Sequence, residues 1–212
     1  MSVVDTTRDT HEVLNQAPPI VPYNVFEADV ALREALEREG GSWGAERVRD
    51  AGGVAGSEEA HEHSERCERN EPRLLTHDRY GNRIDRVDLD PSWHWLLREG
   101  IERGIHALPW REPQPGGHVV RGALAFIWGQ IGAGVMCPIS MTYSGIPALR
   151  EEPDLASQWE PRLTDLDYER GALAGMAMTE KQGGSDVRAN TTRAEPVGDG
   201  EYELTGHKWF CS

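Results

Sequence analysis

The sequence predicts an α+β chain with segregated parts: an all-α N-terminal domain followed by the first strands of a β-domain. The first 170 residues repeat helix start signals, amphipathic runs and glycine stops. After them, small apolar residues without helical periodicity lead to short alternating runs around an Asp199-Gly200 turn. We therefore expect a flexible arm over residues 1–20, a helical domain over 21–170 and the start of a β-domain over 171–212.

The charge balance argues against a nucleic-acid or membrane-surface protein. The 212 residues are 38% hydrophobic, which is enough to bury a core, and 36 acidic against 22 basic side chains give a net charge of -14. Such a surface repels phosphate backbones and anionic lipid. The three cysteines form no C-x-x-C pair, and the N-terminus lacks a basic start with an apolar core. We therefore expect neither a disulfide framework nor a signal peptide, and a cytoplasmic location.

The first helix is expected from about Val25 to Glu39. Asn24 has the side chain of an N-cap, apolar residues recur at helical spacing, and Gly40-Gly41 supplies the stop. One face of this helix is apolar, so it should pack on a core.

Two further helices are expected in the next 30 residues. Ser42 can start one that ends at Gly52-Gly53, and Ser57 can start another that ends before Pro72. The glutamates that follow the second serine suit the positive end of the helix dipole.

A turn-rich stretch then leads to an aromatic helix. The stretch "LTHDRYGNRIDRVDLDP" carries a Gly-Asn turn and alternating apolar residues, which is typical of a loop or short extended piece. Asp90-Pro91 is a cap followed by proline at the first helical position, and the helix that it starts should stop near Pro109.

From Gly122 to Leu149 no residue carries a formal charge. The run exceeds the roughly 20 residues that span a bilayer. Gln130, four glycines near the start of the run and Pro138 argue against a membrane helix, because the proline should break or kink it near Cys137. We expect a buried core helix followed by a second, short helix, and no membrane association.

Two weaker patterns concern metals and nucleophiles. Glu59, His63 and Cys67 fall on one helix face, but no second ligand cluster accompanies them, so a solvated charged face is the favoured interpretation. No serine lies in a G-x-S-x-G pattern. Three isolated histidines are interpreted as surface or core residues rather than ligands or bases: His94, His106 and His118.

The Gly-Gly-Ser-Asp loop has the groups of a polar-ligand site. Gly183 and Gly184 permit positive φ and a close backbone approach, while Thr179, Ser185 and Asp186 offer hydroxyl and carboxylate groups. The lysine precedes the glycines, so the loop is not a phosphate-binding P-loop. From these residues alone, an ordinary β-turn remains at least an equal alternative.

Two segments then give the chain a family resemblance. "MTEKQGGSDV", followed by "GHKWFCS" at the end of the chain, resembles the flavin-binding signature of the acyl-CoA dehydrogenases. Further segments, among them "HEHSERCERNEPRLLTHDRYGNRID" and "CPISMTYS", resemble the AidB-like branch of that family, which belongs to the adaptive response to DNA alkylation. The resemblance runs from about residue 20 to the end of the chain.

The resemblance implies FAD as the cofactor and a set of residues that contact it. Met178 and Thr179 match positions that face the isoalloxazine ring, and Gly184 and Ser185 match positions beside the FAD phosphates. Ser185 also matches a position near the acyl-CoA substrate.

A second contact segment is implied at the end of the chain. Phe210, Cys211 and Ser212 match the family's Trp-x-Thr, whose threonine hydroxyl lies near flavin N5. The serine keeps a hydroxyl, and the phenylalanine replaces the indole, with Trp209 in the neighbouring position.

The resemblance also implies a larger architecture. The family fold is an N-terminal α-domain, a middle β-barrel and a C-terminal helical bundle, assembled as a homotetramer that is a dimer of dimers. The chain is expected to be an N-terminal fragment with the first domain and the opening strands of the barrel. The family's catalytic glutamate belongs to the C-terminal bundle, so no catalytic residue is assigned here. The isolated chain should be inactive and retain little FAD.

The implied function is the N-terminal part of an FAD-dependent, acyl-CoA dehydrogenase-like oxidoreductase. Such an enzyme acts on CH-CH groups by α,β-dehydrogenation of an acyl-CoA thioester. The alternative is a flavin-containing DNA-protection protein with little dehydrogenase activity, or a non-catalytic truncated module. DNA binding in the branch uses a basic C-terminal region, so it is not assigned to these residues.

Overall fold

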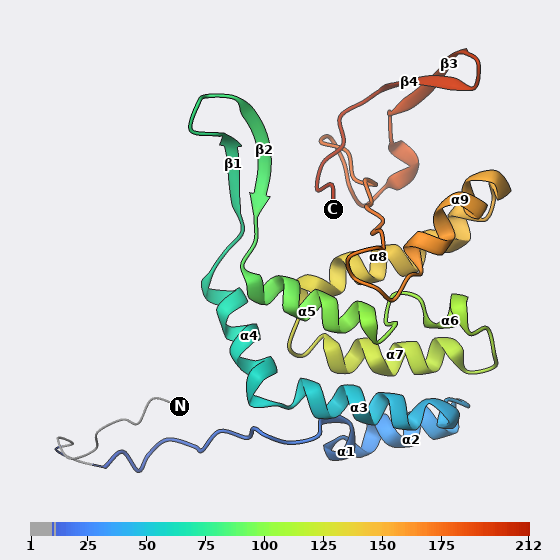
Figure 1. The fold of residues 1–212 in the computed structure, drawn as a ribbon. Helices are drawn as coiled ribbons and strands as arrows, with labels where there is room; N and C mark the ends of the chain where they lie inside the picture. The colour runs from blue at the N-terminus through green and yellow to red at the C-terminus, as the bar shows by residue number, and fades with distance from the viewer. Residues whose placement is uncertain (1–9, 11) are drawn as a thin grey trace.

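The chain forms a layered helical body and a mostly extended C-terminal part (Figure 1). A computed structural model describes residues 10 and 12–212, so the predicted arm over residues 1–20 lies in part outside the described residues. The helices are α1 (Val25–Ala28), α2 (Val30–Arg38), η2 (Ser42–Gly44), α3 (Ala45–Ala55), α4 (Glu58–Arg69), α5 (Pro91–Glu102), α6 (Leu108–Arg111), α7 (Gly117–Trp128), α8 (Ala133–Leu149), α9 (Pro153–Leu163) and η3 (Val187–Ala189). The strands are β1 (Arg73–His77), β2 (Arg83–Asp88), β3 (Arg193–Gly198) and β4 (Glu201–Thr205).

The first predicted helix is in fact two helices. Asn24 caps α1 as predicted, and its side chain accepts two backbone N–H groups at 3.1 Å. The prediction of one helix to Glu39 is wrong, because Asp29 leaves the helical conformation and accepts the Leu32 N–H at 2.8 Å as a second cap. The stop at Gly40 is confirmed by its φ of +81°.

The predicted stop at Gly52-Gly53 is wrong, because α3 continues to Ala55. A Cβ built on Gly52 would lie 2.6 Å from Asn24 Oδ1 and 2.8 Å from the Phe26 nitrogen. The missing side chain therefore lets the start of α1 pack directly on α3. Ser42, where a helix was predicted to start, lies in the 3-10 helix η2, which directly precedes α3.

The next two helices begin where their caps predict. Ser57 and Asp90 each accept a backbone N–H from the first turn of α4 and α5, at 3.1 and 2.8 Å. The predicted end near Pro109 is wrong, because α5 ends at Glu102 and Gly104 takes a φ of +72°. The proline instead lies in the first turn of α6.

The uncharged stretch forms two helices, but the break is not at Pro138. The connection between Trp128 and Ala133 carries two glycines and turns the chain. Pro138 lies inside α8, where it removes one backbone donor without ending the helix. The prediction of a short second helix is also wrong, because α8 has 17 residues and α7 has 12. Across the described part of the chain, every helix is too short or too polar to cross a bilayer.

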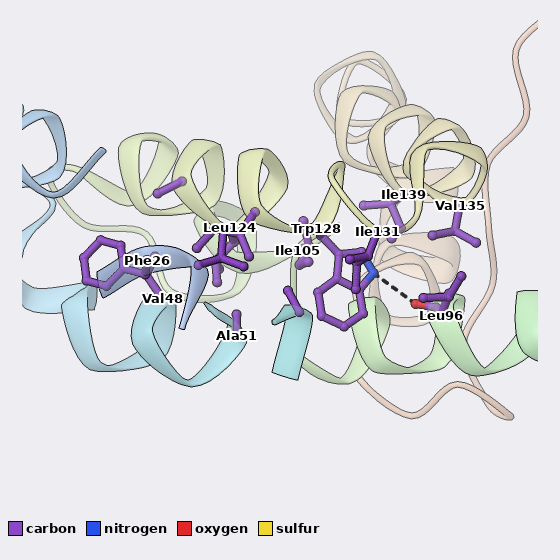
Figure 2. Packing of buried hydrophobic residues seen from close by; sticks show 14 of the residues in the cluster. Phe26, Val48, Ala51, Leu96, Ile105, Leu124, Trp128, Ile131, Val135 and Ile139 are labelled. Atoms are coloured by element: carbon purple, nitrogen blue, oxygen red, sulfur yellow. Dashed lines mark hydrogen bonds between the residues drawn. The ribbon is translucent and has the colours of Figure 1, made fainter. Parts of the chain in front are cut away.

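The helices bury a shared apolar core. Figure 2 shows Phe26, Val48 and Leu124 at one end of this core and Trp128 beside Leu96 further along. Trp128 is fully buried, and its indole Nε1 donates to the Leu96 carbonyl at 3.0 Å. This bond joins α7 to α5 within the core.

The described strands form two separate antiparallel hairpins. β1 and β2 place Leu74 opposite Val87 in a hairpin that projects from the helical body (Figure 1), where the sequence suggested a loop or short extended piece. β3 and β4 meet at the predicted turn, in which Asp199 and Gly200 have φ values of +51° and +77°. β3 and β4 come after the last long helix, α9, which confirms the predicted helical part followed by strands, while the β1–β2 hairpin lies inside the helical part, between α4 and α5.

Candidate functional site

The predicted site lies in the C-terminal part, where the motif segment and the last residues of the chain pair with each other. Met176 and Ser212 exchange two backbone hydrogen bonds of 2.8 and 3.0 Å. The Trp209 N–H donates to the Thr179 carbonyl at 2.9 Å. The two segments that the sequence analysis singled out therefore form one structural unit.

The predicted cofactor contacts on these two segments lie close together. Met178 and Thr179 belong to the motif segment, and Phe210, Cys211 and Ser212 belong to the last segment. Met178 is 54% exposed and Phe210 is 80% exposed. The side chains of Met178 and Phe210 are therefore exposed to solvent next to the paired backbone of the two segments.

Gly184 and Ser185, the remaining predicted contacts, lie in the loop that turns back onto the motif segment. The loop is closed by two backbone hydrogen bonds between Glu180 and Gly183, of 3.1 and 3.2 Å. A Cβ built on Gly184 would lie 3.6 Å from the Thr179 methyl group, whereas one on Gly183 meets nothing within 4 Å. The loop therefore packs closely at one glycine and leaves its backbone approachable at the other.

Glu180 is a central residue that the predicted site did not include. It is only 1% exposed. Its carboxylate accepts the Thr191 N–H at 2.7 Å, the Thr192 N–H at 2.8 Å and the Lys208 ammonium at 3.2 Å. The Thr191 hydroxyl and the Gln182 amide also donate to it. One carboxylate therefore joins the motif segment, the two residues just before β3 and the last segment.

The donors around Glu180 keep its carboxylate ionised. The Thr191 N–H contributes most, and together the donors hold the pKa of the Glu180 carboxyl well below its ordinary value. In the sequence, only its position after Met178 and Thr179 in the Met-Thr-Glu motif pointed to Glu180. Its burial depends on donors more than ten residues away, which a pattern of neighbours does not show.

The arrangement fits a flavin dinucleotide. Met178, Trp209 and Phe210 offer open apolar and aromatic surface, which suits a flat ring system. A Cβ on Gly183 would meet nothing within 4 Å, so there is open space on the loop two residues before Ser185, although the Gly183 N–H itself is bonded to the Glu180 carbonyl. The residues present therefore fit the flavin contacts that the resemblance implies on these two segments.

The histidine and cysteine face of α4 differs from the predicted solvated face. The His63 ring stacks on Trp95 with 4.3 Å between centroids, and its Nδ1 lies 3.0 Å from Ser92 Oγ. Cys67 is half-buried, whereas Glu59 is exposed. The prediction is wrong for the histidine, because α4 packs this face on α5. No group of three or more His, Cys, Asp or Glu side chains among the described residues is arranged to hold a metal ion.

His106 is a core residue, while His94 and His118 lie at the surface. The His106 side chain is 1% exposed, and its Nε2 lies 3.1 Å from the Asp165 carbonyl oxygen. Burial lowers the pKa of His106 to about 4, so the ring is neutral near pH 7. A cavity of about 400 Å³, lined in part by Trp93, runs beside it. This cavity shares no residue with the predicted cofactor contacts.

Comparison with known proteins identifies the family. The family model of the adaptive response protein AidB N-terminal domain matches residues 15–170. The chain belongs to the AidB family. The putative acyl-CoA dehydrogenase AidB of Escherichia coli K12 is 40% identical over 214 residues, which cover 96% of this chain and 40% of that protein. Acyl-CoA dehydrogenase family member 11 of Caenorhabditis elegans is 29% identical over 154 residues, which cover 69% of this chain and 25% of that protein.

A solved structure of the same family resembles this AidB-family chain in fold. Caenorhabditis elegans ACDH-11 in complex with C11-CoA matches with a TM-score of 0.79 and 26% identity, covering 100% of this chain and 38% of that one. Both curated relatives carry the name of the acyl-CoA dehydrogenase family, which together with the structural match confirms the predicted family and fold. The chain spans about two fifths of the length of the AidB protein and of the ACDH-11 structure.

Proposed function

We propose that this chain forms the N-terminal part of an FAD-dependent, acyl-CoA dehydrogenase-like oxidoreductase. The supporting observation is the pairing that brings Met178 and Thr179 beside residues 210–212. These are the two segments that the family resemblance assigns to flavin. The proposed domains are a helical N-terminal domain over residues 21–170 and the start of a β-domain over 171–212.

In this proposal, residues of the chain bind and orient the cofactor. Met178 and Thr179 face the isoalloxazine ring, and the side chains of residues 210–212 flank it. Gly184 and Ser185 approach the phosphates, and Ser185 also lies near the acyl-CoA. Bound FAD supplies a hydride acceptor for the dehydrogenation of a CH-CH group. No residue of this chain is proposed as the catalytic base.

The proposed substrate is an acyl-CoA thioester, since the similar ACDH-11 structure is a complex with C11-CoA. A homotetrameric assembly is proposed from the family resemblance. A reducing, cytoplasmic location is proposed from the cysteines, because Cys67, Cys137 and Cys211 are all free thiols.

A second candidate function comes from the family model, which is named for an adaptive response protein. In this version the protein is a flavin-containing DNA-protection protein with little dehydrogenase activity. The net charge of -14 opposes contact between these residues and phosphate groups. The proposal therefore places DNA contacts outside this chain.

An NMR titration of the chain with FAD tests the flavin site. We expect little flavin after purification, but excess FAD should shift the amide signals of Met178, Thr179, Gly184 and Ser185 and leave those of the helical body unchanged. A Gly184→Val variant should reduce these shifts, because its branched side chain would extend from a Cβ that already lies 3.6 Å from the Thr179 methyl group. Gly122→Ala is the matched control, since a Cβ there meets nothing within 4 Å. Shifts that spread over the helices, or that are equal in both variants, contradict the proposal.

A further inference from the structure

We infer that Glu180 and Lys208 form a positioning pair that sets the spacing between the two cofactor-contact segments. The inference rests on the proposed function for the identity of the cofactor. The pairing itself is a property of the chain that can be measured without flavin.

Lys208 connects the two segments directly. Its ammonium lies 3.2 Å from Glu180 Oε1 and 3.4 Å from the Met178 carbonyl oxygen. The Lys208 side chain is 28% exposed, whereas that of Glu180 is 1% exposed. A charge-assisted hydrogen bond with one buried partner is among the stronger polar contacts in a protein. The ammonium therefore ties the last segment to both the side chain and the backbone of the motif segment.

The same contacts orient the backbone that the proposal assigns to the flavin ring. The Met178 carbonyl also accepts the Asn190 side-chain amide at 3.0 Å, and the Thr179 carbonyl accepts the Trp209 N–H at 2.9 Å. A peptide unit is planar and trans, so its N–H points away from its carbonyl. Because Lys208 and Asn190 hold the Met178 carbonyl on one side, the Thr179 N–H points to the opposite side.

A carboxylate is needed at position 180 because all of its partners are donors. Two consecutive backbone N–H groups, from Thr191 and Thr192, and the Lys208 ammonium converge on its oxygens. An ionised carboxylate only accepts hydrogen bonds, whereas a glutamine amide would present its own N–H groups to one of these donors. Glu180→Gln keeps the size of the side chain, so it should disturb the pairing with little change in volume.

The sequence provides an internal reference for the test. Lys181 and Lys208 are its only lysines, and every other basic side chain apart from histidine is arginine. Lys181 is exposed, with its ammonium 5.1 Å from the centroid of the Trp209 ring. Labelling of the two lysines by acetic anhydride, read by mass spectrometry, therefore compares an exposed lysine with the paired one in the same molecule.

We expect Lys208 to be acetylated several-fold more slowly than Lys181 in the native chain. Glu180→Gln should bring the Lys208 rate close to the Lys181 rate and speed amide hydrogen exchange at Trp209. Glu195→Gln, the same change at an exposed carboxylate on β3, should leave both readouts unchanged. Lys208→Met provides a second variant, in which exchange at Trp209 should rise in the same way.

The outcomes separate the inference from the proposed function. Equal labelling of Lys181 and Lys208 in the native chain, or unchanged exchange at Trp209 in both pair variants, overturns the positioning role. Flavin-induced shifts that persist in full in Glu180→Gln overturn it as well. If the native chain shows no flavin-induced shift, the proposed function fails, while labelling and exchange still decide whether the pair holds the segments together.

Discussion

Replacing His106 by glutamine should remove a large part of the acid sensitivity of the helical body. The buried ring has a pKa of about 4, compared with 6.5 for a free histidine, because burial disfavours its charged form. At mildly acidic pH the unfolded chain binds a proton that the folded chain does not. Stability is therefore full above pH 6.5 and falls as the pH is lowered toward 4.

The size of the effect follows from this difference in pKa. One pKa unit corresponds to about 1.4 kcal/mol, so the difference between the unfolded and folded pKa values of His106 contributes about 3 kcal/mol to the free energy of unfolding. Lowering the pH from about 7.5 to about 5 covers roughly 1.5 units of this pKa difference. That step should destabilise the native chain by about 2 kcal/mol through His106 alone.

Urea unfolding followed by tryptophan fluorescence at the two pH values measures this effect. With a slope of about 1 to 3 kcal/mol per molar urea, 2 kcal/mol moves the midpoint by roughly 1 M. His106→Gln keeps a donor for the Asp165 carbonyl but cannot take up a proton in this range. The variant should unfold with a lower free energy than the native chain at the higher pH, and this difference should be about 2 kcal/mol smaller at the lower pH. His77→Gln, the same change at an exposed histidine, is the matched control. A His106→Gln deficit equal at both pH values would refute the reasoning.

Three further substitutions test the packing. Trp128→Ala should lower the free energy of unfolding by about 3 to 5 kcal/mol in urea titrations, because the fully buried indole fills the core and bonds to Leu96. Gly56→Ala should release the segment before α1 and speed its proteolysis, since a Cβ would lie 1.8 Å from the Tyr23 carbonyl oxygen. Gly122→Ala should be tolerated and raise stability by up to about 1 kcal/mol in thermal unfolding, and a clear loss would show that its side of α7 is covered.

Local signals were enough to predict several features of the fold. The caps at Asn24, Ser57 and Asp90 need only a side chain and a backbone N–H two or three residues later. The Asp199-Gly200 turn likewise depends on its own backbone conformation. Features of this kind are encoded by neighbours in the sequence, so a pattern can predict them.

Other features depend on contacts between distant segments. Gly52 resembles a helix stop, but its role is to admit the first helix against α3. Pro138 resembles a break, but α8 continues through it. In the candidate site, the motif predicted Met178 and Thr179 through family resemblance. The importance of Glu180 became visible only when the chain placed three segments around one carboxylate.

The helical body and the C-terminal part are stabilised in different ways. In the described chain, the fully buried apolar side chains all lie at or before Leu163, whereas the motif segments are joined by backbone bonds and the contacts of Glu180. Native-state hydrogen exchange should therefore show two tiers, with slow amides in the core helices and faster opening at the Met176 and Ser212 pairing. A ligand that orders this pairing would slow hydrogen exchange at the Met176 and Ser212 amides and leave the exchange of the core helices unchanged. Occupancy of the site could then be followed by exchange alone, without a change in the helical body.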